Sequence, residues 1–312
     1  MRRRTEEFDS PWKDALERWF EPFIQLCFPW LHSEIDWSRP PEFLDTELRQ
    51  VVRRALVGRR HVDRLVRIWN LNGEDAWVLI HVEVQVQEDR GFARRMARYH
   101  LRIFDRYDRS VCSLGVLADA NPGWRPDRFV SELWRCRLGL EFPVVKLLDF
   151  TTCWEELERS ANPFAPVIMA HLKALETRRA PRTRYEWKMR IARGLYEHRW
   201  STEQIRELYR VIDWLLALPE PLELQFLDEL VAWERKQTMP YVSNMERRGQ
   251  LKGAIEATQE GILAYLGARL GEVPEDLRES IGSLSDLERL RQLRQFLFAG
   301  ATVEQLRQEL MN

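Results

Sequence analysis

The stretch that decides the fold is Trp77-Val-Leu-Ile-His-Val-Glu-Val-Gln-Val-Gln87. Its even positions are β-branched and apolar throughout, while its odd positions begin apolar and turn polar from His81 onward. Because successive side chains of a strand point to opposite faces of a sheet, this alternation predicts a β-strand with one buried face. The other face ends in a row of hydrogen-bonding groups: His81, Glu83, Gln85 and Gln87. This set is chemically richer than solubility requires.

The preceding segment supplies a partner strand and a second carboxylate. His61 to Trp69 is predicted to be a strand, and the Asn72-Gly73 pair after it is a strong hairpin signal. An antiparallel pair centred on that turn places Asp63 opposite about residue 82, and therefore beside Glu83. Two carboxylates on adjacent strands repel each other and are costly to leave unpaired. A divalent cation is the simplest ligand that makes such a pair favourable.

A third carboxylate is expected from the segment before this hairpin. Pro40-Pro41 is predicted to open a helix from Glu42 to about Leu56, with an apolar stripe at helical spacing. Glu47 lies at the edge of that stripe, and Asp45 is the next most inward acid. Either could join the site, and either could equally be an ordinary solvated helix acid, because buried acids are rare.

Gly91 to Asp108 is predicted to form a helix with an unusual arginine stripe. The arginines recur every four residues: Arg94, Arg98, Arg102 and Arg106. Like charges at this spacing destabilise a helix, so the stripe requires compensation. Acids elsewhere in the fold could provide it. The phosphates of a nucleic acid could also provide it, with Arg95 or Arg98 steadying the backbone.

The remainder of the chain gives a few strands and then helices. Ser110 to Ala118 is typical of a buried central strand. Two further strand-like runs follow, near Phe129 to Arg137 and near Pro143 to Phe150. From about Thr151 the pattern predicts helices at 163–176, 184–199, 201–217 and 221–236 and a last helical section to Met311. Ser201 with Gln204 resembles a capping box.

These elements suggest four regions. They are an N-terminal helical segment (1–40), an α/β core (41–155), a helical extension (156–240) and a C-terminal helical module (245–312). The first is expected to hold one helix that starts at Ser10-Pro11 and runs to about Cys27. In the last, Gly271 to Glu275 breaks the helix, and Ser283 and Thr302 are expected to be caps. Its apolar stripes suit either a helical hairpin or self-association into a homo-oligomer.

Composition excludes several classes of protein. With 312 residues, 45% of them hydrophobic, the chain is globular and long enough for a sizeable core. Its net charge of −1 provides no global attraction for nucleic acid, so such binding requires local patches. The sequence has neither a signal peptide nor an apolar window of about 18 residues, so we expect a soluble cytoplasmic protein without membrane contact. The four cysteines are widely spaced and are expected to be reduced core thiols.

At the predicted hairpin the sequence resembles a known family. Asp63 followed by Glu83-Val-Gln85 looks like the D…(D/E)xK signature of the PD-(D/E)XK nuclease superfamily. The longer runs 61–69 and 77–85 are similar to the Rpn-type recombination-promoting nucleases, which are also described as transposases. The likeness continues through 92–99 and 114–119, and the tail resembles a helical module of unknown function found in cyanobacterial members. A bare D…ExQ would be weak, and the extended run makes the resemblance specific.

The resemblance implies a restriction-endonuclease-like αβββαβ core with a mixed sheet, followed by an all-helical C-terminal region. It implies DNA as partner, Mg²⁺ (or Mn²⁺) as cofactor and endonuclease activity linked to DNA recombination or mobile elements. Asp63 and Glu83 would be metal ligands, with Glu47 as a further acid and the Val84 carbonyl as a possible ligand. Gln85 would be catalytic, at the position where the superfamily has lysine. Phosphate contacts would come from the arginine helix: Arg94, Arg95, Arg98 and Arg102.

Gln85 departs from the superfamily pattern, although glutamine is usual in this subfamily. A neutral amide can orient water but can neither carry a positive charge nor act as a base near pH 7. The reaction would then be slow, or would depend on His81 or on the substrate to activate the water.

Two alternatives stand beside the endonuclease. One is a nuclease-like DNA-binding or protein-interaction module without turnover. The other is a structural arrangement in which Glu83, Gln85 and the arginines all have partners within the fold.

Overall fold

The computed structural model describes residues 9–44, 62–73, 75–83, 89–198, 200–236, 245–284 and 286–311. The chain is a mostly helical α/β protein with small sheets in its N-terminal part and a helical C-terminal region. It divides into two compact units, the N-terminal unit (1–178 and 190–216) and the C-terminal unit (179–189 and 217–312). The mixed α/β class expected from the sequence is confirmed at this level. The restriction-endonuclease-like topology and the four domain boundaries stay predictions.

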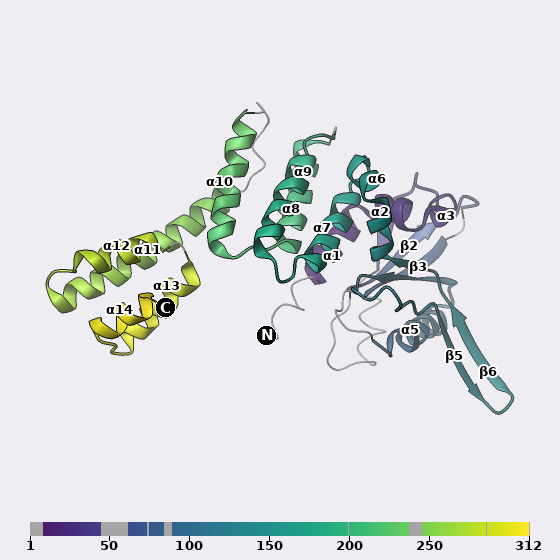
Figure 1. Ribbon diagram of the computed structural model, residues 1–312. Coiled ribbons are helices and arrows are strands. Elements are labelled where there is room, and N and C mark those ends of the chain that lie inside the picture. The colour runs from purple at the N-terminus through teal and green to yellow at the C-terminus, as the bar shows by residue number, and fades with distance from the viewer. Residues whose placement is uncertain are drawn as a thin grey trace. The chain divides into compact units, whose positions relative to one another are not determined.

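The N-terminal unit is built on a five-stranded mixed sheet with the order β1-β2-β3-β4-β7 (Figure 1). Its strands are β1 (Glu42–Phe43), β2 (Val62–Trp69), β3 (Asp75–Glu83), β4 (Val111–Leu117) and β7 (Val144–Lys146). β1, β2 and β3 are antiparallel neighbours, whereas β3, β4 and β7 run parallel. The expected hairpin joins β2 to β3 through Gly73, whose φ of 86° is a conformation that favours glycine. The expected central strand is β4.

Helices lie on both faces of this sheet, and further helices of the same unit pack against those helices. They are α1 (Asp9–Arg18), α2 (Phe20–Cys27), α3 (Pro29–His32), α5 (Phe92–Tyr107), α6 (Trp154–Arg159), α7 (Ala165–Glu176) and α9 (Thr202–Leu215). α5, the predicted arginine helix, is the crossover between parallel strands β3 and β4. It packs on one face, where Leu65 of β2 contacts Tyr99 and Leu117 of β4 contacts Met96. α9 begins with the predicted capping box of Ser201 and Gln204.

The first helix is broken where the sequence suggested continuity. α1 ends at Arg18, and Trp19 has φ −125° and ψ 46°, outside the helical region. Pro22 explains the break, because it has no N–H to donate to the carbonyl of Arg18 and its ring collides with that carbonyl. In the first turn of a new helix, α2, the same proline is tolerated. α1 lies on the sheet face opposite α5, where Arg64 Nη2 donates to Glu17 Oε2 at 2.8 Å.

The helix expected from Glu42 does not begin there. Glu42 and Phe43 form β1, opposite Arg67 and Val66 of β2. An open strand edge satisfies backbone N–H and C=O groups that a local helical pattern cannot reach. Arg67 Nη1 and Glu42 Oε2 add an ion pair at 3.2 Å. The remainder of the expected helix, with Asp45 and Glu47, lies outside the described residues.

A second small sheet emerges from the run predicted as one strand. β5 (Arg128–Leu133) and β6 (Cys136–Glu141) form a two-stranded antiparallel ribbon that extends away from the larger sheet (Figure 1). The chain reverses at Trp134, whose φ is 53°. Cys136 is exposed there, so the expectation of core thiols is wrong for this residue. The run 143–150 is a strand only as far as Lys146 and continues as a 3₁₀ helix, Leu147–Cys153.

The C-terminal unit is helical in its described parts. Its helices are α10 (Glu220–Lys236), α11 (Met245–Leu270), α12 (Glu275–Ser283), α13 (Leu287–Phe298), α14 (Val303–Met311) and the first part of α8 (Pro181–Gly194). The predicted break after α11 is confirmed, with Gly271 at φ 80°. Thr302 caps α14 reciprocally with Gln305 as expected, but Asp286 rather than Ser283 caps α13. Within the described residues, the chain contains no helix with the length and apolar character of a membrane span.

Candidate functional site

The acidic residues predicted from the sequence lie at one edge of the five-stranded sheet. Asp63 pairs with His81, and Glu83 pairs with Leu117, which in turn pairs with Lys146. The parallel strands β3, β4 and β7 end at this edge, and the antiparallel strand β2 begins there. We call it the carboxyl edge. In α/β proteins, ligands commonly bind outside the carboxyl ends of parallel strands.

The register of the hairpin agrees with the expectation to within one residue. Asp63 lies opposite His81, not residue 82. Because side chains alternate along a strand, a one-residue shift changes the face on which a residue belongs. In the observed register Asp63, His81 and Glu83 belong to the same face, with Asp63 and Glu83 as diagonal neighbours. Diagonal residues in an antiparallel pair are about 7–8 Å apart, a spacing that side chains can bridge through an ion.

Part of the predicted site is not covered by the structure. Glu47, Asp45, Val84 and Gln85 lie outside the described residues. For Asp63, His81 and Glu83 the structure describes the backbone alone. Among the remaining described residues, no three His, Cys, Asp or Glu side chains gather in an arrangement suited to a metal ion. The metal-binding and catalytic roles of the predicted residues therefore stay predictions.

The face shared by these acids is the one that α5 covers. Gly115 of β4 pairs with His81. A Cβ at Gly115 would lie 2.7 Å from Val144 Cγ1 and 3.3 Å from Cζ of Phe92, the first residue of α5. A side chain at this position would collide with Val144 of the neighbouring strand and press on Phe92, so glycine lets both pack close to β4. The close contact fixes the N-terminal turn of α5 beside the carboxyl edge.

The arginines of α5 do not share one environment. Arg94 and Arg98 are exposed, and neither has an ion-pair partner among the described residues. Arg102 is half-buried. Arg94 and Arg98 thus meet the first requirement of a phosphate-binding residue, which is access from solvent.

Arg95 is buried and forms an ion pair with Asp89. The other carboxylate oxygen of Asp89 accepts from the Gly91 N–H at 2.8 Å, at the start of α5. The Arg95 guanidinium also lies over the Phe92 ring, 5.7 Å from its centre. Burial in this ion pair leaves Arg95 without the solvent access that its predicted phosphate contact requires, and that contact stays a prediction. The charge of Arg95 is neutralised inside the fold, and the residue holds the first turn of the helix.

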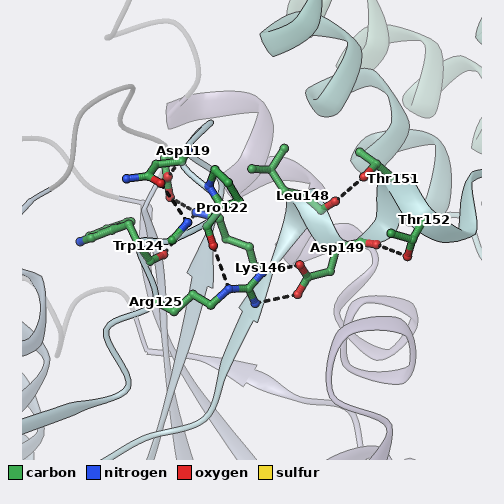
Figure 2. Close-up of polar contacts among 11 residues, drawn as sticks. Asp119, Pro122, Trp124, Arg125, Lys146, Leu148, Asp149, Thr151 and Thr152 are labelled. Carbon is green, nitrogen blue, oxygen red and sulfur yellow. Dashed lines mark hydrogen bonds and ion pairs between the residues drawn. The ribbon is translucent and has the colours of Figure 1, made fainter.

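A buried ion pair at the carboxyl edge was not predicted from the sequence. Asp119 lies two residues after the end of β4, and Lys146 is the last residue of β7. Lys146 Nζ donates to Asp119 Oδ2 at 2.5 Å, with side chains 0% and 2% exposed. Figure 2 shows the lysine reaching this carboxylate beside Trp124, whose ring centre is 5.5 Å from Nζ. An acid two residues after a buried strand was the signal that could have suggested it.

A second ion pair lies beside it at the surface. Arg125 donates to both carboxylate oxygens of Asp149, at 2.8 and 2.5 Å (Figure 2). These hydrogen bonds hold the pKa of Asp149 below its usual value, and they raise the pKa of Arg125. Because both side chains are about half exposed, solvent screens the pair and its contribution to stability is small.

His171 of α7 supports the carboxyl edge from the opposite face. Trp12 Nε1 donates to its Nδ1 at 3.3 Å, so Nε2 carries the proton and donates to the Ala118 carbonyl at 2.8 Å. Burial lowers the pKa of His171 to about 4. The ring is therefore neutral at physiological pH and has no access to substrate. Its role is to tie α1 and α7 to the end of β4.

The His171 environment predicts a loss of stability in acid. Between pH 6.5 and about 4 the unfolded chain binds a proton at His171 that the folded chain does not, so the free energy of unfolding falls as the pH falls. One pKa unit corresponds to about 1.36 kcal/mol, so about 3 kcal/mol is lost across this interval. In His171→Gln, whose amide can still donate to Ala118, this contribution should vanish. Urea unfolding of the wild type and of His171→Gln at several pH values measures this contribution. Equal losses of stability in the two proteins as the pH falls would contradict the assignment to His171.

The chain was compared with models of protein families, with curated proteins and with solved structures, and none of the three comparisons gave a match.

Proposed function

We propose that this protein is a Mg²⁺-dependent DNA endonuclease whose active site lies at the carboxyl edge. The observation that carries the proposal is the register of β2 and β3, which assigns Asp63 and Glu83 to one face at one end of the sheet. The order of elements is further support. Three antiparallel strands, a crossover helix and a parallel strand succeed one another as in the αβββαβ core that the sequence resemblance implies.

The donor set suits a hard divalent cation. Mg²⁺ takes one or two protein carboxylates and completes its shell with water and substrate phosphate oxygens. Bound between Asp63 and Glu83, it would polarise the scissile phosphodiester and lower the pKa of the attacking water. Mn²⁺ accepts the same oxygen ligands.

Proton transfer is assigned to His81 in this proposal. Attack of water on phosphorus breaks the bond to the leaving oxygen, and the water must lose a proton in the process. Gln85 can orient that water but cannot accept its proton near pH 7. His81 is directly opposite Asp63 in the register, and histidine titrates in the range that a general base requires.

Plasmid cleavage tests the proposal directly. Purified protein should nick or linearise supercoiled DNA with Mg²⁺ or Mn²⁺, and should leave it intact with Ca²⁺ or EDTA. Cleavage that persists in EDTA would contradict a metal-dependent mechanism. If the protein binds DNA but does not cut it with any of the metals, the module without turnover is the better description, with Gln85 as the reason.

The two exposed arginines of α5 should contribute sequence-independent DNA binding. Each phosphate contact that is lost lowers the slope of log K against log salt concentration by about 0.9. Arg94→Ala/Arg98→Ala should therefore reduce that slope by about 2. The control is Arg291→Ala in α13, another exposed arginine, which should leave the slope unchanged. Fluorescence anisotropy with a labelled duplex at several salt concentrations measures the slope for the wild type, the double variant and the control. Equal slopes in all three proteins would exclude Arg94 and Arg98 from the DNA interface.

A further inference from the structure

The outer edge of the ribbon strand β6 has no partner among the described strands. β6 pairs with β5 alone, and nearly all of its residues are exposed. An open edge presents a row of backbone donors and acceptors, which proteins usually protect with charged side chains, above all lysine, with proline or with a bulge. β6, with the sequence Cys136-Arg-Leu-Gly-Leu-Glu141, contains neither lysine nor proline, and its two charges are of opposite sign, so they do not repel a second copy of the strand. The edge is therefore suited to pairing with another strand.

The sequence of β6 is complementary to itself when reversed. If two copies are laid antiparallel with Gly139 opposite Gly139, Arg137 of one copy lies opposite Glu141 of the other, and Leu138 opposite Leu140. Alternation puts the charged residues on one face and the leucines on the other. Opposite charges and paired aliphatic side chains are both favourable cross-strand neighbours. The five positions from Arg137 to Glu141 are thus matched in this register.

Gly139 has no explanation within one chain. It does not have a positive φ, and a Cβ there would meet no atom closer than the Phe129 carbonyl oxygen at 3.9 Å. A larger residue would therefore fit, and glycine weakens a strand. Glycine inside a strand often marks a place where another backbone approaches closely. In the self-complementary register that place is the two-fold axis.

The charges of the ribbon favour a second copy over nucleic acid. Its strands carry two pairs of opposite charges, Arg128 across from Glu141 and Glu132 across from Arg137. A polyanion would be repelled by the two glutamates, whereas a second ribbon satisfies both signs. The exposed leucines, Leu133 and Leu138, also suit a protein surface better than phosphates.

We propose that two copies of the chain associate through β6, forming a four-stranded antiparallel sheet with the order β5-β6-β6-β5 and a two-fold axis at Gly139. Such an interface is isologous, because the same residues contribute from both copies. Two six-residue strands are expected to bury less than the roughly 800 Å² per partner of a stable complex, so the dimer should dissociate on dilution. This association is separate from the endonuclease proposal and from self-association through the C-terminal helices.

Disulfide trapping tests the register. In a Cys136→Ser background, which removes the exposed native thiol, Gly139→Cys places two thiols opposite each other at the axis. Opposite Cα atoms in an antiparallel pair are about 4.5–5.5 Å apart, which is within the range of a disulfide. The matched control is Ser131→Cys on β5, also exposed, whose two copies would be at least about 14 Å apart, three strand spacings.

Gly139→Cys should give a covalent dimer on mild oxidation, visible on a non-reducing gel, and Ser131→Cys should stay monomeric. Equal cross-linking of the two variants, or none at position 139, would overturn the register.

Sedimentation equilibrium tests the association itself. Val130 and Leu138 are 44% and 45% exposed and belong to opposite faces of the ribbon. Leu138→Glu, which meets Leu140 of the second copy, should weaken the dimer at least 10-fold. Val130→Glu, on β5, should leave its dissociation constant within about 2-fold of the wild type. A wild type that is monomeric at all concentrations, or a dimer that Leu138→Glu does not weaken, would exclude this interface.

Discussion

Asp63→Asn should lower the rate of Mg²⁺-dependent plasmid cleavage by about 100-fold or more. Asparagine keeps the size of the side chain but removes the charge that holds a divalent cation. A lost metal contact costs several kcal/mol of transition-state stabilisation, and each 1.36 kcal/mol is a factor of ten in rate. Glu83→Gln should give a similar loss. The double variant should be little worse than either single variant, because residues that act as a unit are not additive.

A control on the same hairpin separates loss of the metal from loss of the fold. Asp75, the first residue of β3, pairs with Trp69 at the opposite end of the hairpin from Asp63. Asp75→Asn should cleave at the rate of the wild type. Titration calorimetry with Mn²⁺ should show binding to the wild type and to Asp75→Asn, and none to Asp63→Asn. Wild-type cleavage by Asp63→Asn would exclude the carboxyl edge as the active site.

Lys146→Met is expected to lower the free energy of unfolding by about 3–5 kcal/mol. Removing one partner of a buried ion pair leaves the other charge without compensation, which costs about this much. Lys146 and Asp119 are nearly inaccessible to water, so the carboxylate of the variant cannot be solvated without disrupting the end of β4. Urea unfolding monitored by circular dichroism measures the change.

The neighbouring pair of Arg125 and Asp149 provides the matched control. Its side chains are 45% and 57% exposed, and its hydrogen bonds are of comparable length. Asp149→Asn should therefore cost less than about 1 kcal/mol. Asp119→Asn combined with Lys146→Met should cost less than the sum of the two single changes, because the double variant leaves no buried charge. Equal losses for Lys146→Met and Asp149→Asn would show that burial does not determine the contribution of this pair.

Local signals predicted many of the elements. The alternation around His81 predicted β3, the Asn72-Gly73 pair predicted the hairpin, and the apolar run before Ala118 predicted β4. The Ser201 capping box was also found as expected. Each of these rests on interactions between residues close in sequence, so the residues themselves contain the information.

The predicted and observed secondary structures differ where backbone from a distant part of the sequence competes with a local pattern. Glu42 followed a helix-start signal, but the open edge of β2 converted it to a strand. The turn at Trp134 was missed because tryptophan is not a residue that signals a reversal, and its positive φ is uncommon. The break after Arg18 was different, because Pro22 was a local signal that could have been used.

For the candidate site, the sequence by itself determined which residue types are present and which strand or helix each belongs to. It placed a carboxylate on each arm of a hairpin and arginines along the next helix. Only the tertiary structure decided the register that assigns Asp63 and Glu83 to one face, the burial of Arg95 against Asp89 and the pairing of Asp119 with Lys146, 27 residues apart. The physical reason is that alternation and turn signals act over a few residues. Which charge is buried, and with which partner, depends on how whole strands and helices pack.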